Sequence, residues 1–272
     1  METEIKRDVI RVDERHPIQF KVGHQNLFGM MHMPLIGQKV PAVLICHGLG
    51  GDKNGRYRAY VILARMLAEN GIACMRFDYR GCGDSEGEFS QVTLSSQVED
   101  AIAASHFLQH YPGIDNTRLG IFGRSFGGLI AVHAAAKTKA FCSIGLWSAV
   151  FNGEPWREIW EQAQMGTLPQ EHYNAAMTVN GHIVDVQLWK ELFMSDTSGS
   201  LGHLHDIPLL HIHGEKDGRV SVSQADEYHK IREAAQAPNH FLRLKESDHD
   251  FSNIWEREEA FESTLDWFRQ TL

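Results

Sequence analysis

The sequence has no long apolar run. No stretch approaches the roughly 20 consecutive apolar residues that a membrane-spanning helix requires. The opening residues, METEIKRDVIRVDERHPIQF, carry too many charges for a secretory signal. These absences predict a cytoplasmic protein that does not associate with membranes.

Basic residues are also scarce. The chain contains 26 Lys and Arg residues against 35 Asp and Glu, which gives a formal net charge of -9. Binding to the phosphates of nucleic acids requires clustered Lys and Arg, and the sequence has no such cluster. We therefore expect no nucleic-acid partner.

Cysteine is rare as well. The four cysteines, Cys46, Cys74, Cys82 and Cys142, are widely spaced, and three of them lie in apolar segments. Free cysteine in such segments behaves as a small hydrophobic residue, so neither a disulfide framework nor a zinc site is predicted. Cys82, in the turn-like RGCGDSEG, is the one that we expect to be exposed.

The remaining composition is that of an ordinary globular protein. Of the 272 residues, 43% are hydrophobic and 22% are charged. This length suits one sizeable α/β domain, or such a domain with an inserted subdomain.

Apolar strand-like segments alternate with helical patterns along most of the chain. The first forty residues alternate polar and apolar positions, with a break at GHQN that indicates a hairpin of two antiparallel strands. Five further strands are predicted at 41–48, 72–79, 117–123, 141–149 and 207–214, and a last one at 239–245. Helices are predicted at 57–70, 95–111, 126–137, 223–236 and 258–272. This order predicts an α/β fold with a mostly parallel central sheet and helices on both faces.

The alternation stops between residues 151 and 200. This segment has three tryptophans and helix-like stretches but no obvious buried strand. We expect residues 1–150 and 201–272 to form the core, and residues 151–200 an inserted cap.

One serine lies between glycines where a strand pattern gives way to a helix pattern. The segment GRSFG places Gly123 and Gly127 on either side of Ser125. A tight strand-to-helix turn would present the hydroxyl at its apex, beside the positive end of the helix. Ser125 is therefore the candidate nucleophile, with a structural turn serine as the alternative.

A serine hydroxyl needs a base and a carboxylate that orients the base. Asp217 follows the strand predicted at 207–214, and His249 follows the one at 239–245. Loops after parallel strands gather at one edge of the sheet, so these residues can converge on Ser125. The order Ser, Asp, His is that of the α/β-hydrolase fold.

Taken together, the motifs resemble those of α/β-hydrolases of the serine esterase and acylaminopeptidase-like group. The chain is most similar to the small bacterial esterases that include cinnamoyl and feruloyl esterases. The matching segments, in family order, are HGLGG (47–51), FDYRGCGDSEG (77–87), GRSFGG (123–128), HGEKDGRV (213–220) and SDHDF (247–251).

The resemblance implies a role for each site residue. It makes Ser125 the nucleophile, His249 the general base and then acid, and Asp217 the residue that orients the imidazole. The backbone N–H groups of Leu49 and Phe126 would form the oxyanion hole. No metal or cofactor is implied.

Several residues have alternative interpretations. Glu215 competes with Asp217 as the acid, whereas Asp248 and Asp250 should point away from the histidine as loop or capping residues. Arg124 either faces the substrate or holds neighbouring carboxylates. Alternate histidines at positions 203, 205, 211 and 213 suggest a zinc site, although their spacing does not imply convergence.

The cap contains the candidate substrate contacts. Trp156, Trp160 and Trp189 are the main ones, and the same group includes Tyr173, Met165, Met177, Phe193 and Met194. They either line an apolar acyl or aryl pocket or pack the cap onto the core.

The predicted activity is hydrolysis of a small-molecule carboxylic ester. The same triad would also serve a thioesterase or acyl-peptidase, which leaving-group preference would distinguish. A catalytically silent hydrolase fold used for binding is the alternative outside enzymes. The oligomeric state stays open, with a homodimer as one option.

Overall fold

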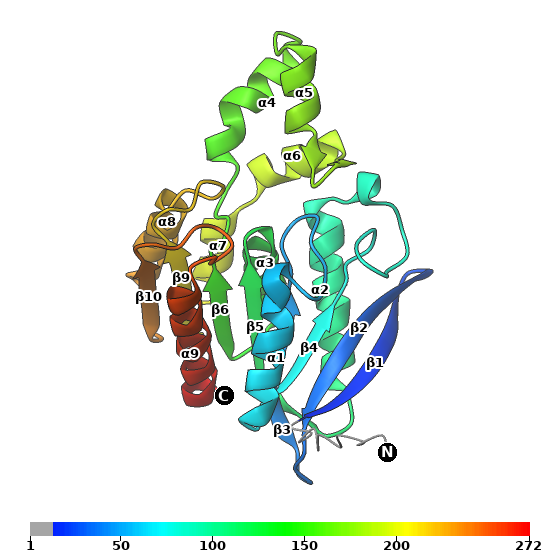
Figure 1. Cartoon of the computed structure of the whole chain (residues 1–272), viewed down its shortest axis with the longest axis vertical. Helices are drawn as coiled ribbons and strands as arrows, with labels where there is room; N and C mark the ends of the chain where they lie inside the picture. The colour runs from blue at the N-terminus through cyan, green and yellow to red at the C-terminus, as the bar shows by residue number, and fades with distance from the viewer. Residues whose placement is uncertain (1–12) are drawn as a thin grey trace, which may run out of the picture.

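The computed structural model describes residues 13–272, which form an eight-stranded sheet with a helical segment above its carboxyl edge (Figure 1). The strand order is β1-β2-β4-β3-β5-β6-β9-β10. The strands are β1 (Asp13–Val22), β2 (Gln25–Pro34), β3 (Val40–Cys46), β4 (Ala73–Phe77), β5 (Ile114–Arg124), β6 (Ser143–Trp147), β9 (Leu209–Gly214) and β10 (Asn239–Leu244). All neighbours from β4 to β10 pair in parallel.

The hairpin predicted in the first forty residues is present. Strands β1 and β2 pair antiparallel, and β2 pairs antiparallel with β4, so the hairpin extends one edge of the sheet. The turn between the strands contains Gly23, whose φ of 59° suits glycine. The twelve residues before β1 lie outside the described part of the chain.

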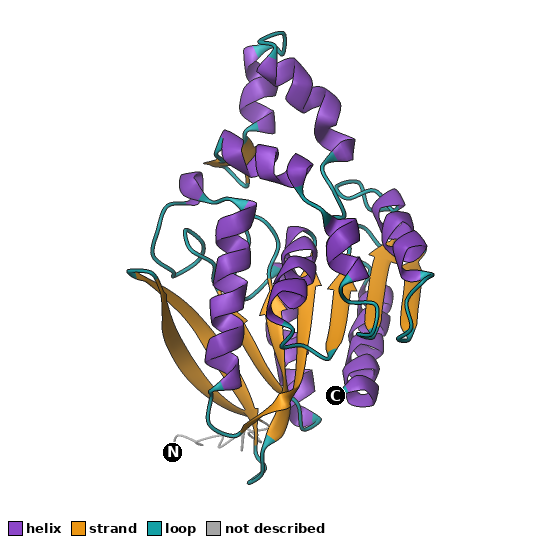
Figure 2. Ribbon diagram, turned by 180° about the vertical axis from the view of Figure 1, so that it is seen from behind, coloured by secondary structure: helices purple, strands orange, loops and turns teal. Residues whose placement is uncertain are grey.

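Helices cover both faces of the sheet, as predicted. Helices α1 and α9 pack on one face, and α2 and α3 on the other, which is turned to the viewer in Figure 2. The bounds of the core helices are α1 (Ala59–Glu69), α2 (Leu94–Gln109), α3 (Phe126–Thr138), α8 (Ser223–Arg232) and α9 (Ile254–Thr271), with short 3₁₀ helices at Arg56–Arg58 and Phe89–Gln91. The apolar strands are therefore buried on both sides, which explains why they read as nearly continuous hydrophobic runs.

Most of residues 151–200 lie beyond the carboxyl ends of the strands and add no strand to the central sheet (Figure 1). The elements are a 3₁₀ helix (Glu154–Trp156), α4 (Arg157–Gln164), α5 (Gln170–Ala176), the two-residue strands β7 (Thr178–Val179) and β8 (His182–Ile183), α6 (Val186–Met194) and α7 (Thr197–Gly202). Helices α4 and α5 contain no buried residue, whereas α7 packs against α3 of the core. The end of α9 lies at the opposite end of the molecule.

One cysteine prediction is wrong. Cys82 is only 5% exposed, although a turn position was expected to be open to solvent. The Asp78 carboxylate accepts hydrogen bonds from the backbone of Lys53 and Asp84. These contacts fold the turn back over the end of β4, so the Cys82 side chain joins the core.

Candidate active site

Ser125 lies at the turn between β5 and α3 in a strained conformation. Its φ is 57° and its ψ is -128°, values that residues with a side chain rarely adopt. The backbone holds this conformation, because Ser125 N–H donates to Trp147 O at 2.9 Å and Ser125 O accepts from Gly128 and Val150. The turn thus places the hydroxyl at the sheet edge, ahead of the N-terminus of α3.

The two flanking glycines are required by close approach. A Cβ atom at Gly123 would lie 2.3 Å from the carbonyl oxygen of Gly127. A Cβ atom at Gly127 would lie 2.3 Å from the carbonyl oxygen of Cys46. Only glycine lets β5, α3 and the end of β3 meet this closely.

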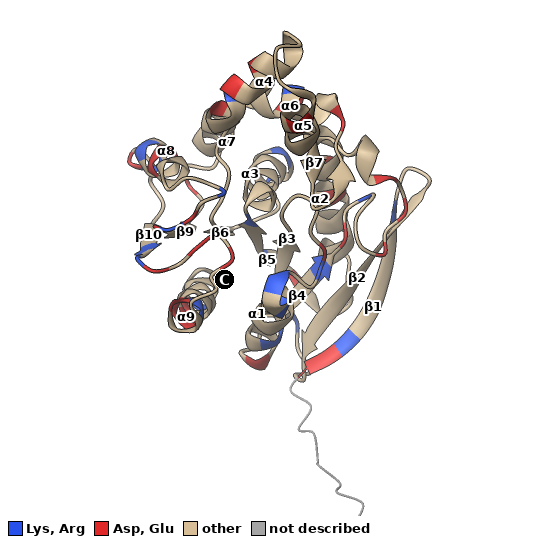
Figure 3. Cartoon of the chain, turned by 45° about the horizontal axis from the view of Figure 1, so that its top comes forward, with Lys and Arg blue, Asp and Glu red and all other residues tan. Residues whose placement is uncertain are grey.

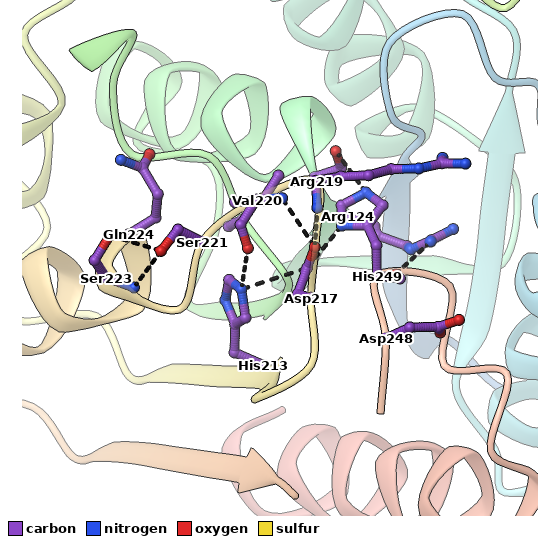
Figure 4. Close-up of polar contacts among 12 residues, drawn as sticks. Arg124, His213, Asp217, Arg219, Val220, Ser221, Ser223, Gln224, Asp248 and His249 are labelled. Carbon is purple, nitrogen blue, oxygen red and sulfur yellow. Dashed lines mark hydrogen bonds and ion pairs between the residues drawn. The ribbon is translucent and has the colours of Figure 1, made fainter. Parts of the chain in front are cut away.

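The loops after β9 and β10 bring Asp217 and His249 to Ser125. The Ser125 hydroxyl lies 3.1 Å from Nε2 of His249. Nδ1 of His249 lies 2.8 Å from Oδ2 of Asp217 (Figure 4). Because the carboxylate accepts the Nδ1 proton, Nε2 is left free to accept the proton of the hydroxyl.

Several hydrogen-bond donors surround the side chain of Asp217 and keep it ionised. Its Oδ1 accepts from the backbone N–H groups of Arg219 and Val220 at 2.9 and 2.8 Å. Burial opposes ionisation, but the hydrogen bonds from His213 and His249 outweigh it and hold the pKa of Asp217 below its usual value. The rival Glu215 is exposed and contacts neither histidine.

His213 is a contact that the sequence analysis did not assign to this site. Its Nε2 donates to Val220 O at 2.9 Å and lies 3.4 Å from Oδ2 of Asp217 (Figure 4). The sequence did contain one indication of this contact, because His213 lies only four residues before Asp217, at the end of β9. His211 and His213 are buried, whereas His203 and His205 are exposed beyond α7, so the alternate histidines do not converge.

Arg124 holds a carboxylate and a backbone carbonyl. It donates to Oδ1 of Asp250 at 2.5 Å and to the carbonyl oxygen of His249 at 2.6 Å. The Asp250 carboxylate is thus bound by Arg124 and contacts neither nitrogen of the His249 ring. Asp248 accepts from the backbone of Asp250 and Ser252 and shapes the same loop.

The loop after β3 also approaches Ser125, and a Cβ atom at Gly48 in this loop would lie 3.3 Å from the Ser125 Cβ. His47 fixes this loop, because its Nδ1 donates to Gly48 O at 2.8 Å and its Nε2 accepts from Tyr79 N–H. Burial lowers the pKa of His47, which keeps the ring neutral in this role. The N–H groups of Leu49 and Phe126 have no acceptor within residues 13–272, and both residues line the cavity described next.

A cavity of about 630 Å³ lies between the sheet edge and the segment above it. Ser125, His249, Leu49 and Phe126 line it from the core. Trp156 and Trp189 line it from the other side, with ring centroids 6.4 Å apart.

Trp160 does not line this cavity. Its ring packs on Phe193 at 5.7 Å, because α4 leads away from the sheet. Met165 and Met194 are 73% and 84% exposed, and Met177 is buried. Of the eight apolar candidates in the cap, Trp156 and Trp189 are the two that reach the cavity.

Charged residues of both signs are spread over the described chain (Figure 3). Within residues 13–272, no cluster of three or more His, Cys, Asp or Glu side chains could hold a metal ion. No helix in this range has both the length and the apolar character needed to cross a bilayer.

Comparison with solved structures shows the same fold in known hydrolases. The ferulic acid complex of Est1E from Butyrivibrio proteoclasticus superposes with a TM-score of 0.76 at 20% identity, over 93% of this chain and 99% of that one. A Pyrococcus horikoshii acylaminoacyl peptidase gives 0.72 at 17% identity, over 97% of this chain and 42% of that one. Identities this low establish the fold alone.

Sequence comparison finds curated relatives of higher identity over shorter regions. The quorum-quenching protein AidA of Acinetobacter baumannii is 34% identical over 128 residues, which cover 47% of this chain and 41% of AidA. An uncharacterised 31.7 kDa protein of Escherichia coli is 36% identical over 101 residues, which cover 37% of this chain and 34% of that protein. The chain thus matches less than half the length of these relatives.

A match to a family covers more of the chain. The family described as serine aminopeptidase, S33, matches residues 37–179, which is more than half of the 272 residues. The matched range includes the loop after β3 and the turn that carries Ser125. Together with the fold, this match shows that the chain belongs to the serine aminopeptidase S33 family of α/β-hydrolases.

Proposed function

We propose that this protein hydrolyses carboxylic esters of small molecules through an acyl-enzyme formed on Ser125. The observation that carries the proposal is the hydrogen-bonded series of Ser125, His249 and Asp217 at the cavity. Membership of a serine hydrolase family supports it. A hydrolase fold that had lost its catalytic activity would not need all three side chains in this arrangement.

The first half of the reaction forms the acyl-enzyme. His249 Nε2 takes the hydroxyl proton while Ser125 Oγ attacks the ester carbonyl carbon, which gives a tetrahedral intermediate. Asp217 stabilises the imidazolium that forms, and its low pKa keeps it ionised throughout. The intermediate collapses when His249 returns the proton to the leaving alcohol.

The second half hydrolyses the acyl-enzyme. His249 takes a proton from a water molecule, and the water oxygen attacks the acyl carbon. The new tetrahedral intermediate expels Ser125 Oγ, which recovers its proton from His249. The products are the free acid and the enzyme in its starting form.

The oxyanion of both intermediates would be bound by the N–H groups of Leu49 and Phe126. Both groups are free of partners within residues 13–272, and Phe126 opens helix α3, whose dipole favours negative charge there. Loss of one such donor typically lowers the rate by about 10²- to 10³-fold. Because Leu49 acts through its backbone, Leu49→Ala should change the rate little.

Residues 151–200 would act as a cap over this site, and residues 13–150 and 201–272 as the catalytic core. Trp156 and Trp189 give the cap an apolar surface toward the cavity. Apolar walls suit an aryl or alkyl acyl group. The ferulic acid complex of Est1E, a protein of the same fold, agrees with an aromatic acid as one candidate.

Labelling with a fluorophosphonate tests the proposal without a known substrate. The reagent should modify Ser125 in the wild-type protein, as located by peptide mass mapping, and should not modify Ser125→Ala or His249→Ala. Ser125→Ala should also lose at least about 10⁴-fold in p-nitrophenyl ester hydrolysis while its thermal unfolding stays close to wild type. Ester cleavage at the wild-type rate by folded Ser125→Ala would refute the mechanism.

Leaving-group preference then separates esters from other acyl substrates. An oxygen ester, its thioester and its amide with the same acyl group should be compared at equal concentrations. The proposal expects the oxygen ester to have the highest kcat/KM relative to its uncatalysed rate. A higher relative value for the thioester or the amide would move the assignment to a thioesterase or an acyl-peptidase.

A further inference from the structure

Two arginines on the core side of the cavity share a single carboxylate. Arg56, after β3, and Arg219, after β9, both line the cavity, and their side chains are 54% and 59% exposed. Arg56 Nε lies 3.2 Å from Asp250, and an Arg219 terminal nitrogen lies 3.8 Å from the same oxygen. Within residues 13–272 neither arginine has another carboxylate within 4.0 Å.

Asp250 is already neutralised by a closer partner. Arg124 donates to it at 2.5 Å, and the two side chains are only 9% and 12% exposed. The attraction within a buried pair of this kind is screened little by water. Arg56 and Arg219 therefore share a carboxylate whose closest partner is a third arginine.

The other acidic residue of the cavity wall does not compensate them. Asp52 lines the cavity, but its Oδ1 accepts from the backbone N–H groups of Asn54 and Gly55. It lies within ion-pair distance of no arginine in the described chain. Three arginines (Arg56, Arg124 and Arg219) and two aspartates (Asp52 and Asp250) therefore line the cavity, whereas the whole protein has a net charge of -9.

The opposite wall has a different character. Trp156, Trp189, Leu188 and Leu192 line it, and none of these side chains is charged. In Figure 4 the Arg219 side chain extends alongside His249 and Arg124. One cavity therefore presents both an apolar surface and two guanidinium groups to the space beside Ser125.

We propose that Arg56 and Arg219 bind a carboxylate of the substrate, so that the preferred esters carry a negative charge as well as an apolar part. Guanidinium groups present paired N–H donors that match a carboxylate, and half-exposed arginines keep donors free for it. The inference rests on the proposed ester hydrolysis at Ser125. It names the class of substrate that this site would take.

Matched ester pairs test the inference. The p-nitrophenyl ester of hexanoic acid and the mono-p-nitrophenyl ester of adipic acid have acyl chains of equal length that end in a methyl group or a carboxylate. Phenyl butyrate and 3-carboxyphenyl butyrate place the same difference on the alcohol. For each pair, the measured quantity is the ratio of kcat/KM for the anionic ester to that for the neutral one.

The double variant Arg56→Gln with Arg219→Gln should lower this ratio by about tenfold in at least one pair. The pair that responds shows whether the carboxylate belongs to the acid or to the alcohol. The matched control is Arg118→Gln with Arg269→Gln, two arginines of similar exposure that pair with Asp115 and Asp266 away from the cavity. Raising the ionic strength from about 0.1 to about 1 M should lower the wild-type ratio and leave the double variant nearly unaffected.

Equal ratios in the wild type and the double variant, for both pairs, would overturn the inference. So would the same decrease in the control variant. These outcomes differ from failure of the proposed function, in which the neutral esters are not cleaved and Ser125 is not labelled by the fluorophosphonate.

Discussion

On the core side of the cavity, Ser125, Asp217 and His249 follow strands of the central sheet, and backbone hydrogen bonds fix the loops that carry them. On the cap side, Trp156 and Trp189 come from short helical segments, and neighbouring α4 and α5 bury no residue. Reacting groups tolerate little displacement, whereas an apolar wall can adjust to different acyl groups. We therefore propose that the chemistry depends on the core and the substrate range on the cap.

The largest effect is expected from the charge on Asp217. Asp217→Asn should lower kcat by about 10⁴-fold, because the amide cannot stabilise the imidazolium and favours the wrong histidine tautomer. Initial rates of ester hydrolysis at pH 7 measure the loss. Glu215→Gln, two residues away and exposed, is the matched control and should stay within about twofold of wild type. If Glu215→Gln had the larger effect, the identity of the acid would be wrong.

The core should also set the pH dependence of stability. Burial lowers the pKa of His32 and of His133 from 6.5 to about 4 in each case. The unfolded chain therefore binds more protons between pH 6.5 and 4, and the free energy of unfolding should fall as the pH drops through this window.

Urea unfolding at pH 7 and pH 5 measures this slope. We expect the wild type to lose about 2 kcal/mol for each of the two histidines over this interval, as an upper estimate. His133→Gln should lose less than the wild type, because one of the two groups no longer titrates. An unchanged slope in His133→Gln would show that this histidine is not held neutral by burial.

A smaller effect is expected on the cap side. Trp156→Ala and Trp189→Ala should each raise KM for esters of long or aromatic acids by about fivefold, since each removes apolar contact area. They should change kcat for acetate esters much less. Trp160→Ala is the control, because Trp160 packs on Phe193 outside the cavity. Equal effects of all three substitutions would indicate a general loosening of the cap.

The smallest effect is expected at Met194, which is exposed on α6. Met194→Ser should leave both the free energy of unfolding and kcat/KM nearly unchanged, within about 0.5 kcal/mol for stability. Denaturation and steady-state kinetics check this. A marked loss of activity would show that the cap closes further during the reaction.

Much of the fold was predictable because the sequence patterns that mark its strands and turns involve residues close together in the chain. Apolar runs marked the strands, and the glycines beside Ser125 marked a turn that only glycine permits. Strand order was not predictable, since β4 lies between β2 and β3 through pairings that depend on the whole sheet. The convergence of Asp217 and His249 followed from a general rule, that loops after parallel strands share one edge.

Contacts between side chains were harder to predict. The link from Arg124 to Asp250 joins residues 126 positions apart, and the sequence does not reveal which of two roles Arg124 takes. Cys82 was wrongly expected to be exposed, because its burial depends on how Asp78 folds the following turn. Trp156 and Trp160 are four residues apart and would share one face of a continuous helix. Trp156 instead ends a 3₁₀ helix before α4 begins, and the sequence does not specify this break.

The position of the C-terminus has a practical consequence. Helix α9 ends at the far end of the sheet from α4 and α5 (Figure 1). A tether attached there would fix the protein to a solid support with the cavity turned away from it. Substrate would then reach Ser125 by diffusion from the open solution, so the immobilised protein should keep the turnover rate of the free one.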